Sequence, residues 1–257
     1  MTERIDDIII LGRGVPEQIS DGRVTVCVAG YSHQCGLVRL YPTRIDSPLC
    51  LWSIVSVEVE RNPQDNRAES WKFPKSRDEW ASINRHIEVI GELPKSRRMG
   101  LLESLRTPCI ASLNEGRKSL GIIRPSSVRG YLSTNKLHQQ AYQPLFEMME
   151  HAQVWTKRDH FAEPRIQYTC GDSCASRTPH NQQLLDWGCY QWMKKHPGRE
   201  QEIWRNLRFG DDSWQHYFLV GNQANQRTSF MVINVLRQKT ELVQCSFLDP
   251  ISDLQQP

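Results

Sequence analysis

The chain has 257 residues, which suits one large domain or two small ones. An apolar content of 39%, a charged content of 24% and a net charge of only +3 are typical of an ordinary soluble globular protein. The longest apolar runs, residues 8–11 and 230–233, are strand-length and exclude a membrane-spanning helix, which needs about 20 apolar residues. The N-terminus has no signal-peptide core, so we expect a cytoplasmic protein with no membrane partner.

The N-terminal segment carries short runs that are rich in β-branched and aromatic residues. Clusters of Gly, Pro, Asp and Ser separate these runs, which occupy residues 8–11, 24–28, 37–41 and 54–59. Short strands at this regular spacing are typical of a small barrel or a strongly bent sheet. We therefore expect residues 1–75 to form a β-barrel.

The middle of the chain, residues 76–150, is expected to be a helical insert with connecting strands. Asp78 can cap a helix whose apolar positions reach Ile90, and Pro94 would end it. Residues 119–125 have the pattern of a strand that a proline stops.

The last part of the chain, residues 151–257, alternates helix and strand signals, which predicts an α+β domain. Residues 182–195 have a partly apolar face and two lysines in the last turn, which suit a helix. The expected strands here are residues 217–220, 231–236 and 242–247. The whole chain is thus predicted to be α+β and mainly β.

Two stretches resemble known bacterial proteins. Residues 24–30, 36–42 and 54–59 combine a Cys-(hydrophobic)-Ala-Gly step, a Gly-x-(hydrophobic)-Arg strand and an Ile-Val-x-Val strand. This pattern resembles the N-terminal half of the bacterial dual-OB-containing domain proteins. The resemblance implies an OB-like barrel and a role in conflict systems that handle foreign nucleic acid. A Cys-Cys-His segment followed by Asp186-Trp187 and Phe218-Leu-Val-Gly221 is similar to a further set of uncharacterised bacterial proteins.

The Cys-Cys-His segment is the clearest candidate site. Cys170, Cys174 and His180 lie within eleven residues, in a turn rich in Gly, Asp, Ser and Pro. Thiolate and imidazole are ligands that zinc prefers, so we expect a zinc knuckle in the α+β half. A structural zinc site needs a fourth ligand, and Cys189 is the nearest thiol along the chain; Cys109, Cys27 and His160 are more distant alternatives. The simpler alternative is a pair of thiols beside an incidental histidine.

An enzyme centre near the same segment is the second hypothesis. A catalytic zinc would keep an open position, with Asp172 or Asp186 as base or supporting partner. A thiol nucleophile would pair Cys170 or Cys174 with a histidine. The sequence lacks the zinc-deaminase pattern and carries no sign of an oxyanion hole.

Basic and aromatic residues point to nucleic acid as the partner. The 32 basic residues comprise 23 Arg and 9 Lys, and arginine matches phosphates and base edges with a planar geometry that lysine lacks. A GC-rich genome, whose codons favour arginine, explains the excess equally well. Since OB barrels bind single strands through basic grooves and aromatic stacking, the candidate contacts are Arg39, Tyr41, Arg124, Trp155, Lys157 and Arg158.

The leading hypothesis is therefore a nucleic-acid-binding accessory protein, binding DNA or RNA, of a bacterial defence or mobile-element system. The alternatives are an enzyme acting on nucleic acid or nucleotide, centred on Cys170, Cys174, His180 and Asp186, and a protein-interaction subunit of a larger complex.

Overall fold

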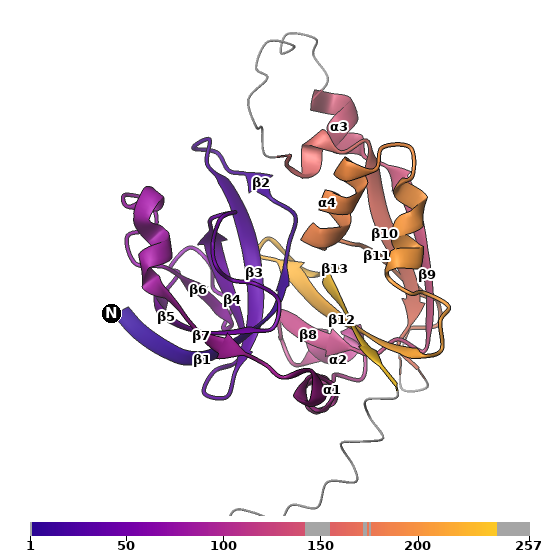
Figure 1. Cartoon of the computed structure of the whole chain (residues 1–257), viewed down its shortest axis with the longest axis horizontal. Helices are drawn as coiled ribbons and strands as arrows, with labels where there is room; N and C mark the ends of the chain where they lie inside the picture. Colours follow the sequence, from indigo (N-terminus) through magenta and orange to yellow (C-terminus); the bar gives the residue numbers. More distant parts are fainter. Residues whose placement is uncertain (1, 142–154, 172–173, 175, 241–257) are drawn as a thin grey trace, which may run out of the picture.

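The computed structural model describes residues 2–141, 155–171, 174 and 176–240 (Figure 1). An N-terminal barrel, drawn in indigo to magenta, packs against a second half drawn from pink to yellow. Strands dominate and the helices are short, which confirms the expected mainly-β, α+β class.

Five strands close the N-terminal barrel: β1 (Thr2–Arg13), β3 (Val24–Ser32), β4 (Gly36–Thr43), β5 (Ser53–Arg61) and β6 (Ser70–Lys72). Their order around the ring is β1-β3-β4-β6-β5, and β5 pairs back onto β1. All neighbours are antiparallel except β4 and β6, which run parallel. A five-stranded Greek-key barrel is the OB architecture, so the expected OB-like barrel is confirmed.

The barrel interior follows the two-residue period of its strands. On β4, Val38 and Leu40 are fully buried in the barrel core, whereas Arg39, between them, belongs to the opposite face. Phe73 and Ile83, which follow β6, join the same core.

Two more strands extend this sheet, β2 (Glu17–Gln18) on β3 and β7 (Ile87–Glu92) on β5. The prediction of a helix from Asp78 to Ile90 was wrong for the residues after His86. Only a 3-10 helix, η1 (Trp80–His86), forms, and the β-branched residues after it pair with β5 as an edge strand.

Pro94 does not end a helix as expected. It directly precedes α1 (Lys95–Ser104), where the missing N–H of proline removes no helical hydrogen bond.

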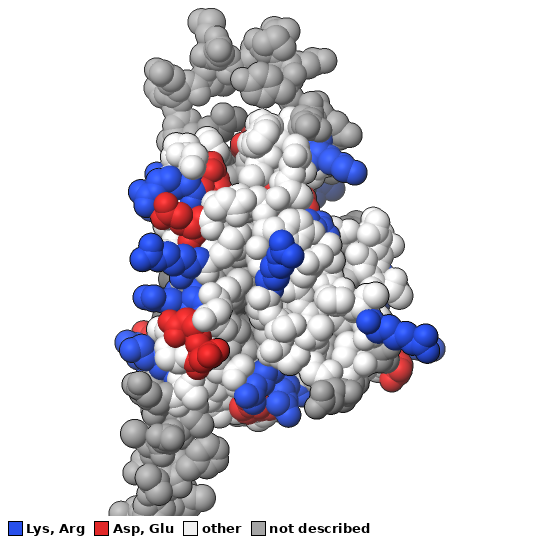
Figure 2. All heavy atoms as spheres, turned by 90° about the vertical axis from the view of Figure 1, so that its right-hand side faces the viewer, with Lys and Arg blue, Asp and Glu red and all other residues white. Residues whose placement is uncertain are grey.

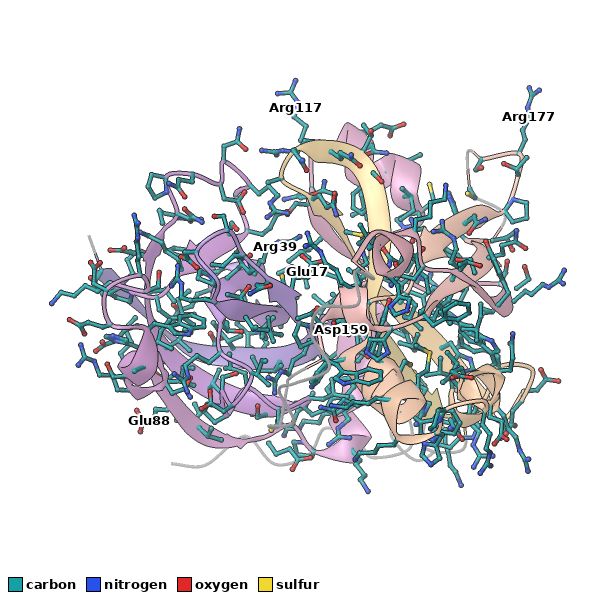
Figure 3. The ribbon with its side chains drawn as sticks, turned by 90° about the horizontal axis from the view of Figure 1, so that it is seen from above. Glu17, Arg39, Glu88, Arg117, Asp159 and Arg177 are labelled. Carbon is teal, nitrogen blue, oxygen red and sulfur yellow. The ribbon has the colours of Figure 1, made fainter. Side chains whose placement is uncertain are left out.

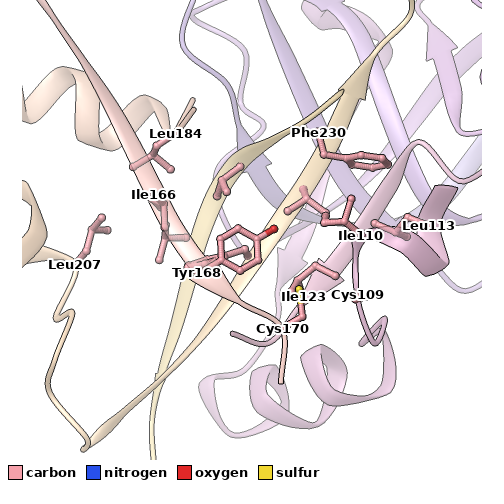
Figure 4. Close-up of a cluster of buried hydrophobic side chains, with 14 of the residues drawn as sticks. Cys109, Ile110, Leu113, Ile123, Ile166, Tyr168, Cys170, Leu184, Leu207 and Phe230 are labelled. Carbon is pink, nitrogen blue, oxygen red and sulfur yellow. The ribbon is translucent and has the colours of Figure 1, made fainter. Parts of the chain in front are cut away.

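The second half contains two three-stranded antiparallel sheets. The first sheet comprises β9 (Ser127–Thr134), β10 (Ala162–Thr169) and β11 (His180–Gln183), in the order β11-β10-β9. The second sheet comprises β8 (Leu120–Ile123), β12 (Trp214–Gln223) and β13 (Gln226–Lys239), in the order β13-β12-β8. A parallel bridge between Leu184 and Val232 connects the two sheets. A buried cluster that draws on both sheets, including Ile123, Tyr168 and Phe218, forms the core of this half (Figure 4).

Short helices complete the second half: α2 (Ile110–Glu115), α3 (Lys136–Ala141), η2 (Lys157–Asp159), α4 (Trp187–Lys195), η3 (Glu200–Glu202) and α5 (Ile203–Asn206). The helix expected over residues 182–195 begins only at Trp187, because residues 180–183 pair with β10 as a strand. The strands expected at 217–220 and 231–236 lie within β12 and β13. The strand expected at 242–247 lies outside the described residues.

An apolar interface joins the barrel to the second half. Leu11 on β1 and Trp52 before β5 pack in one buried cluster with Ile122, Tyr217 and Leu219 of the second half. Residues of α1, among them Met99 and Leu102, belong to the same cluster. The two halves therefore share a hydrophobic core.

Gly12 packs tightly against the second half across this interface. A Cβ atom at this position would lie 2.7 Å from Asn234 Cβ and 2.8 Å from Leu219 Cδ2. We expect Gly12→Ala to lower the free energy of unfolding by about 1–3 kcal/mol, as overpacking does. Gly91→Ala is the control, because nothing lies within 4 Å of its Cβ position, and it should change stability by less than ~1 kcal/mol. Urea denaturation checks both, and equal stabilities would contradict the close packing of the halves.

Candidate metal centre and binding cleft

The Cys-Cys-His group assembles at the loop end of the β10–β11 hairpin. Cys170 directly follows β10, and His180 is the first residue of β11. The ligand atoms of Cys170, Cys174 and His180 all lie within 4.8 Å of one another, and Cys174 Sγ is 3.3 Å from His180 Nε2. This group can hold a metal ion.

Burial keeps two of the three ligands, Cys170 and His180, uncharged at neutral pH. Burial raises the pKa of the Cys170 thiol to about 12, and Cys174 adds to the rise, whereas an N–H that Ile110 donates to the Cys170 sulfur opposes it. Burial also lowers the pKa of the His180 imidazole. A cation bound here would therefore displace at least the Cys170 proton and meet a neutral imidazole.

Cys189, the expected fourth ligand, lies outside this group. It is buried in the first turn of α4 and is not one of the grouped ligands. Burial raises the pKa of its thiol well above the usual value, Asp186 adds to the rise, and Arg237 opposes it. The nearest thiol along the chain is thus not among the ligands, since β11 carries the chain from the loop end of the hairpin to its opposite end before α4 begins.

Asp186 is the N-cap of α4, as an acidic residue before a helix predicts. Its carboxylate accepts the backbone N–H groups of Cys189 and Val235, each at 3.2 Å. Burial raises the pKa of this carboxyl, although these N–H groups and that of Gly188 act to lower it. Asp186 therefore ties α4 to β13.

Replacing Asp186 by alanine would leave buried N–H groups without an acceptor. We expect Asp186→Ala to lower the free energy of unfolding by about 1–3 kcal/mol, and Asp186→Asn, which keeps one acceptor oxygen, to cost less. Chemical denaturation of the two variants measures this order. An alanine variant as stable as the native chain would contradict the capping role.

Arg39 and Tyr41 lie on the outer side of β4, where the second half covers part of the barrel. Arg39 is only 5% exposed, and its guanidinium donates to the Ser119 carbonyl at 3.1 Å and to Cys27 Sγ at 3.5 Å. Figure 3 shows Arg39 where the two halves meet. Tyr41 is half-buried and its hydroxyl accepts a hydrogen bond from Thr25. In this structure, Arg39 thus joins the halves and does not face solvent.

The other expected contacts are spread over the second half. Arg124 is exposed and pairs with Glu103 at 3.0 Å. Lys157 is buried and donates to Gln183 Oε1 at 2.8 Å, while its neighbour Arg158 is exposed.

Trp155 lies at the margin of the fold and is 36% exposed. Its ring meets His160 edge-on at 5.1 Å, and the Lys194 ammonium lies 5.0 Å from its centroid. The six expected contacts therefore do not form a single basic groove.

One face of the second half can be followed in Figure 2. Lysine and arginine side chains lie along one edge and are interspersed with aspartate and glutamate, while the middle of this face is largely uncharged. This face offers no continuous basic surface.

A cleft of about 800 Å³ lies between the barrel and the second half. Its lining includes five basic residues and four tryptophans: Arg13, Lys95, Arg98, Arg237, Lys239, Trp52, Trp187, Trp192 and Trp214. Asp186 is the one carboxylate among the described residues that line it. The three residues of the metal group do not line it.

Most of the cations that line the cleft form no ion pair with a described residue. Arg98 pairs with Glu92 at 2.6 Å and stacks over Trp52, but Lys95, Arg237 and Lys239 form no ion pair with any described residue. Arg237 and Lys239 share one face of β13 because they lie two residues apart, and Lys239 is the register partner of Trp214. Their charges lie 6.0 and 5.9 Å from the Trp214 ring centroid.

These cleft residues were not predicted from the sequence. They come from β1, the turn before β5, α1, α4 and the β12–β13 hairpin, which only the fold brings together. The one local signal is the Arg-x-Lys alternation at the end of β13, opposite a tryptophan.

Comparison with protein families divides the chain at the start of the second half. A family model described as a domain of unknown function (DUF8758) matches residues 4–104, and a second, also a domain of unknown function (DUF8757), matches residues 109–252. The second match covers more than half of the sequence, so the chain belongs to the DUF8757 family. No curated protein matched the sequence. In the described part of the chain, no helix is long and apolar enough to cross a membrane.

Proposed function

We propose that this chain binds single-stranded nucleic acid in the cleft between its barrel and its second half. The observation that carries the proposal is the composition of the cleft, whose lining holds four tryptophans and five cations but only one carboxylate among the described residues. Stacking rings and backbone-directed cations are the two elements by which proteins hold unpaired strands.

Single strands suit this cleft better than a duplex does. Tryptophan faces bind a base only when the base is unstacked, whereas a duplex presents phosphates and groove edges. Trp187, Trp192 and Trp214 are only partly buried, so their rings retain accessible surface within the cleft. Lys95, Arg237 and Lys239 would neutralise the phosphates of the bound strand.

Binding is favoured over catalysis in this cleft. Acid–base catalysis needs a titratable group that can reach a substrate proton. The one carboxylate in the described lining, Asp186, accepts backbone N–H groups and is held as a helix cap. As the dual-OB resemblance implies, we place this binding activity in a bacterial system that handles foreign nucleic acid, where a partner protein would supply the reaction.

We further propose that the metal of the Cys170, Cys174 and His180 group is zinc. Two sulfurs and an imidazole nitrogen are a ligand set that favours zinc over magnesium or calcium, which prefer oxygen. A zinc ion here would fix the end of the β10–β11 hairpin and supply folding energy.

The zinc proposal predicts metal content and its dependence on pH. About one zinc per chain should copurify, and Cys170→Ser should lose it, whereas Cys35→Ser, at an exposed position, should keep it. Because the pKa of Cys170 is about 12, lowering the pH should weaken zinc binding by roughly tenfold per pH unit from this thiol alone. Elemental analysis and competition with a chromophoric chelator measure both quantities. A chain that binds no zinc at pH 8 would refute the proposal.

The cleft proposal predicts which variants lose binding to labelled homopolymeric single strands of DNA and RNA. Trp214→Ala should weaken binding by about 1–3 kcal/mol, or roughly 5- to 150-fold, if its ring stacks on a base. Arg237→Glu and Lys239→Glu should each weaken binding and reduce its salt dependence, because each removes one phosphate contact.

Arg117→Glu is the charge-matched control. Arg117 is exposed and points away from the rest of the chain in Figure 3, so this change should leave affinity within about twofold of the native value. Thermal melting of each variant shows whether it remains folded. Equal losses at Arg117 and Arg237, or native affinity in all the cleft variants, would contradict the cleft as the binding site.

A further inference from the structure

The metal group offers three ligands, whereas a closed structural zinc site takes four. Besides Cys170, two cysteines are buried in the same core cluster, Cys109 and Cys189. The residues around each of these two cysteines show which of them could act as the fourth ligand.

Cys189 is held away from the metal group. It lies in the first turn of α4, and its backbone N–H donates to the Asp186 carboxylate. Asp186 and Arg237 are the charged groups near its thiol, and both line the cleft. For Cys189 to bind the metal, the first turn of α4 would have to move and break its N-cap hydrogen bond to Asp186.

Cys109 lies at the metal group. It is 2% exposed and is the residue immediately before α2, in an extended conformation with φ −161° and ψ 174°. The next residue, Ile110, donates its backbone N–H to the Cys170 sulfur, so the backbone at Cys109 is adjacent to that ligand. Figure 4 shows Cys109 and Cys170 at the same end of the cluster.

The surroundings of Tyr168 agree with this placement. Its ring is buried in the same cluster and lies 5.1 Å from the His180 ring. Burial raises its pKa well above the usual value, and Cys170, Cys174 and Cys109 each add to the rise. Tyr168 therefore lies near the sulfurs of Cys109, Cys170 and Cys174 and near the His180 imidazole. Cys189 is not among the groups that raise the pKa of Tyr168.

We propose that Cys109 supplies the fourth ligand and completes a zinc site of three cysteines and one histidine. In this structure, Cys109 Sγ lies 3.7 Å from Ser112 Oγ and is not among the ligand atoms that lie within 4.8 Å of one another, so the sulfur would have to move toward Cys170 when the metal binds. The inference rests on the zinc site proposed above. On binding, each of the three thiols gives its proton to solvent and its sulfur lone pair to Zn²⁺, while the neutral imidazole donates a lone pair and releases no proton.

Such a site would connect two distant segments of the second half. It joins the start of α2 to the end of the β10–β11 hairpin, across the sequence from Cys109 to His180. These elements contribute to one buried cluster, so the metal would hold them together at one end of that core.

X-ray absorption of the native zinc-loaded chain tests the proposal without a substitution. The expected first shell contains three sulfurs at about 2.3 Å and one nitrogen at about 2.0 Å. A shell of two sulfurs would overturn the assignment of Cys109. A chain that binds no zinc would overturn the metal proposal as well, but it would leave the nucleic-acid proposal to its own binding test.

Matched variants give a second test through cobalt(II) titration of the metal-free chain. Cys109→Ser should lose thiolate-to-cobalt charge-transfer intensity, bind at least about tenfold more weakly and release one proton fewer per metal. Cys189→Ser, equally buried in the same cluster, should keep the native spectrum and proton count. A Cys109→Ser variant with the native spectrum, or loss of the spectrum in Cys189→Ser, would contradict the proposal.

Discussion

The apolar interface between the barrel and the second half is the contact on which the rest of the structure depends. Leu11 and Trp52 of the barrel share one buried cluster with Tyr217 and Leu219 of the second half. At Gly12 the strands approach too closely for any larger residue to fit without a shift. This packing creates the cleft, because residues of β1, the turn before β5 and α1 line it from one side and residues of α4 and the β12–β13 hairpin line it from the other.

The interface also explains why buried charges lie on the outside of the barrel. Arg39 donates to the Ser119 carbonyl, and Arg67 donates to the Asn222 carbonyl at 2.6 Å. Burial alone would raise the pKa of Asp65, but hydrogen bonds from Arg67 and Ser70 outweigh it and hold that pKa at about 2. Breaking one partner of such a buried pair is costly, so these contacts fix how the two halves are oriented. The barrel face that often binds ligands in OB folds is thereby used to join the halves, and the open cleft lies elsewhere.

The sequence predicts what is local and fails where the fold brings distant segments together. The barrel strands could be predicted because their period of two and their turns are short-range signals. Cys170 and His180 could be paired because one turn connects them. Arg39 was expected at a binding surface because the alternation of side chains along a strand shows that a residue points out of the barrel. It does not show whether solvent or the second half of the chain lies against that residue, and here the second half does. The cleft could not be predicted, since Arg13 and Arg237 come to line one cleft only after the halves pack.

Photocrosslinking is the most direct test of whether single-stranded nucleic acid binds in the cleft. A single strand carrying iodouracil is irradiated with the native chain, and the crosslinked peptides are identified by mass spectrometry. If the cleft binds the strand, crosslinks form at Trp187, Trp192 or Trp214, which line the cleft, and they are lost when unlabelled single strand competes. Crosslinks confined to the outer face of the second half, with none on a cleft tryptophan, would contradict binding in the cleft.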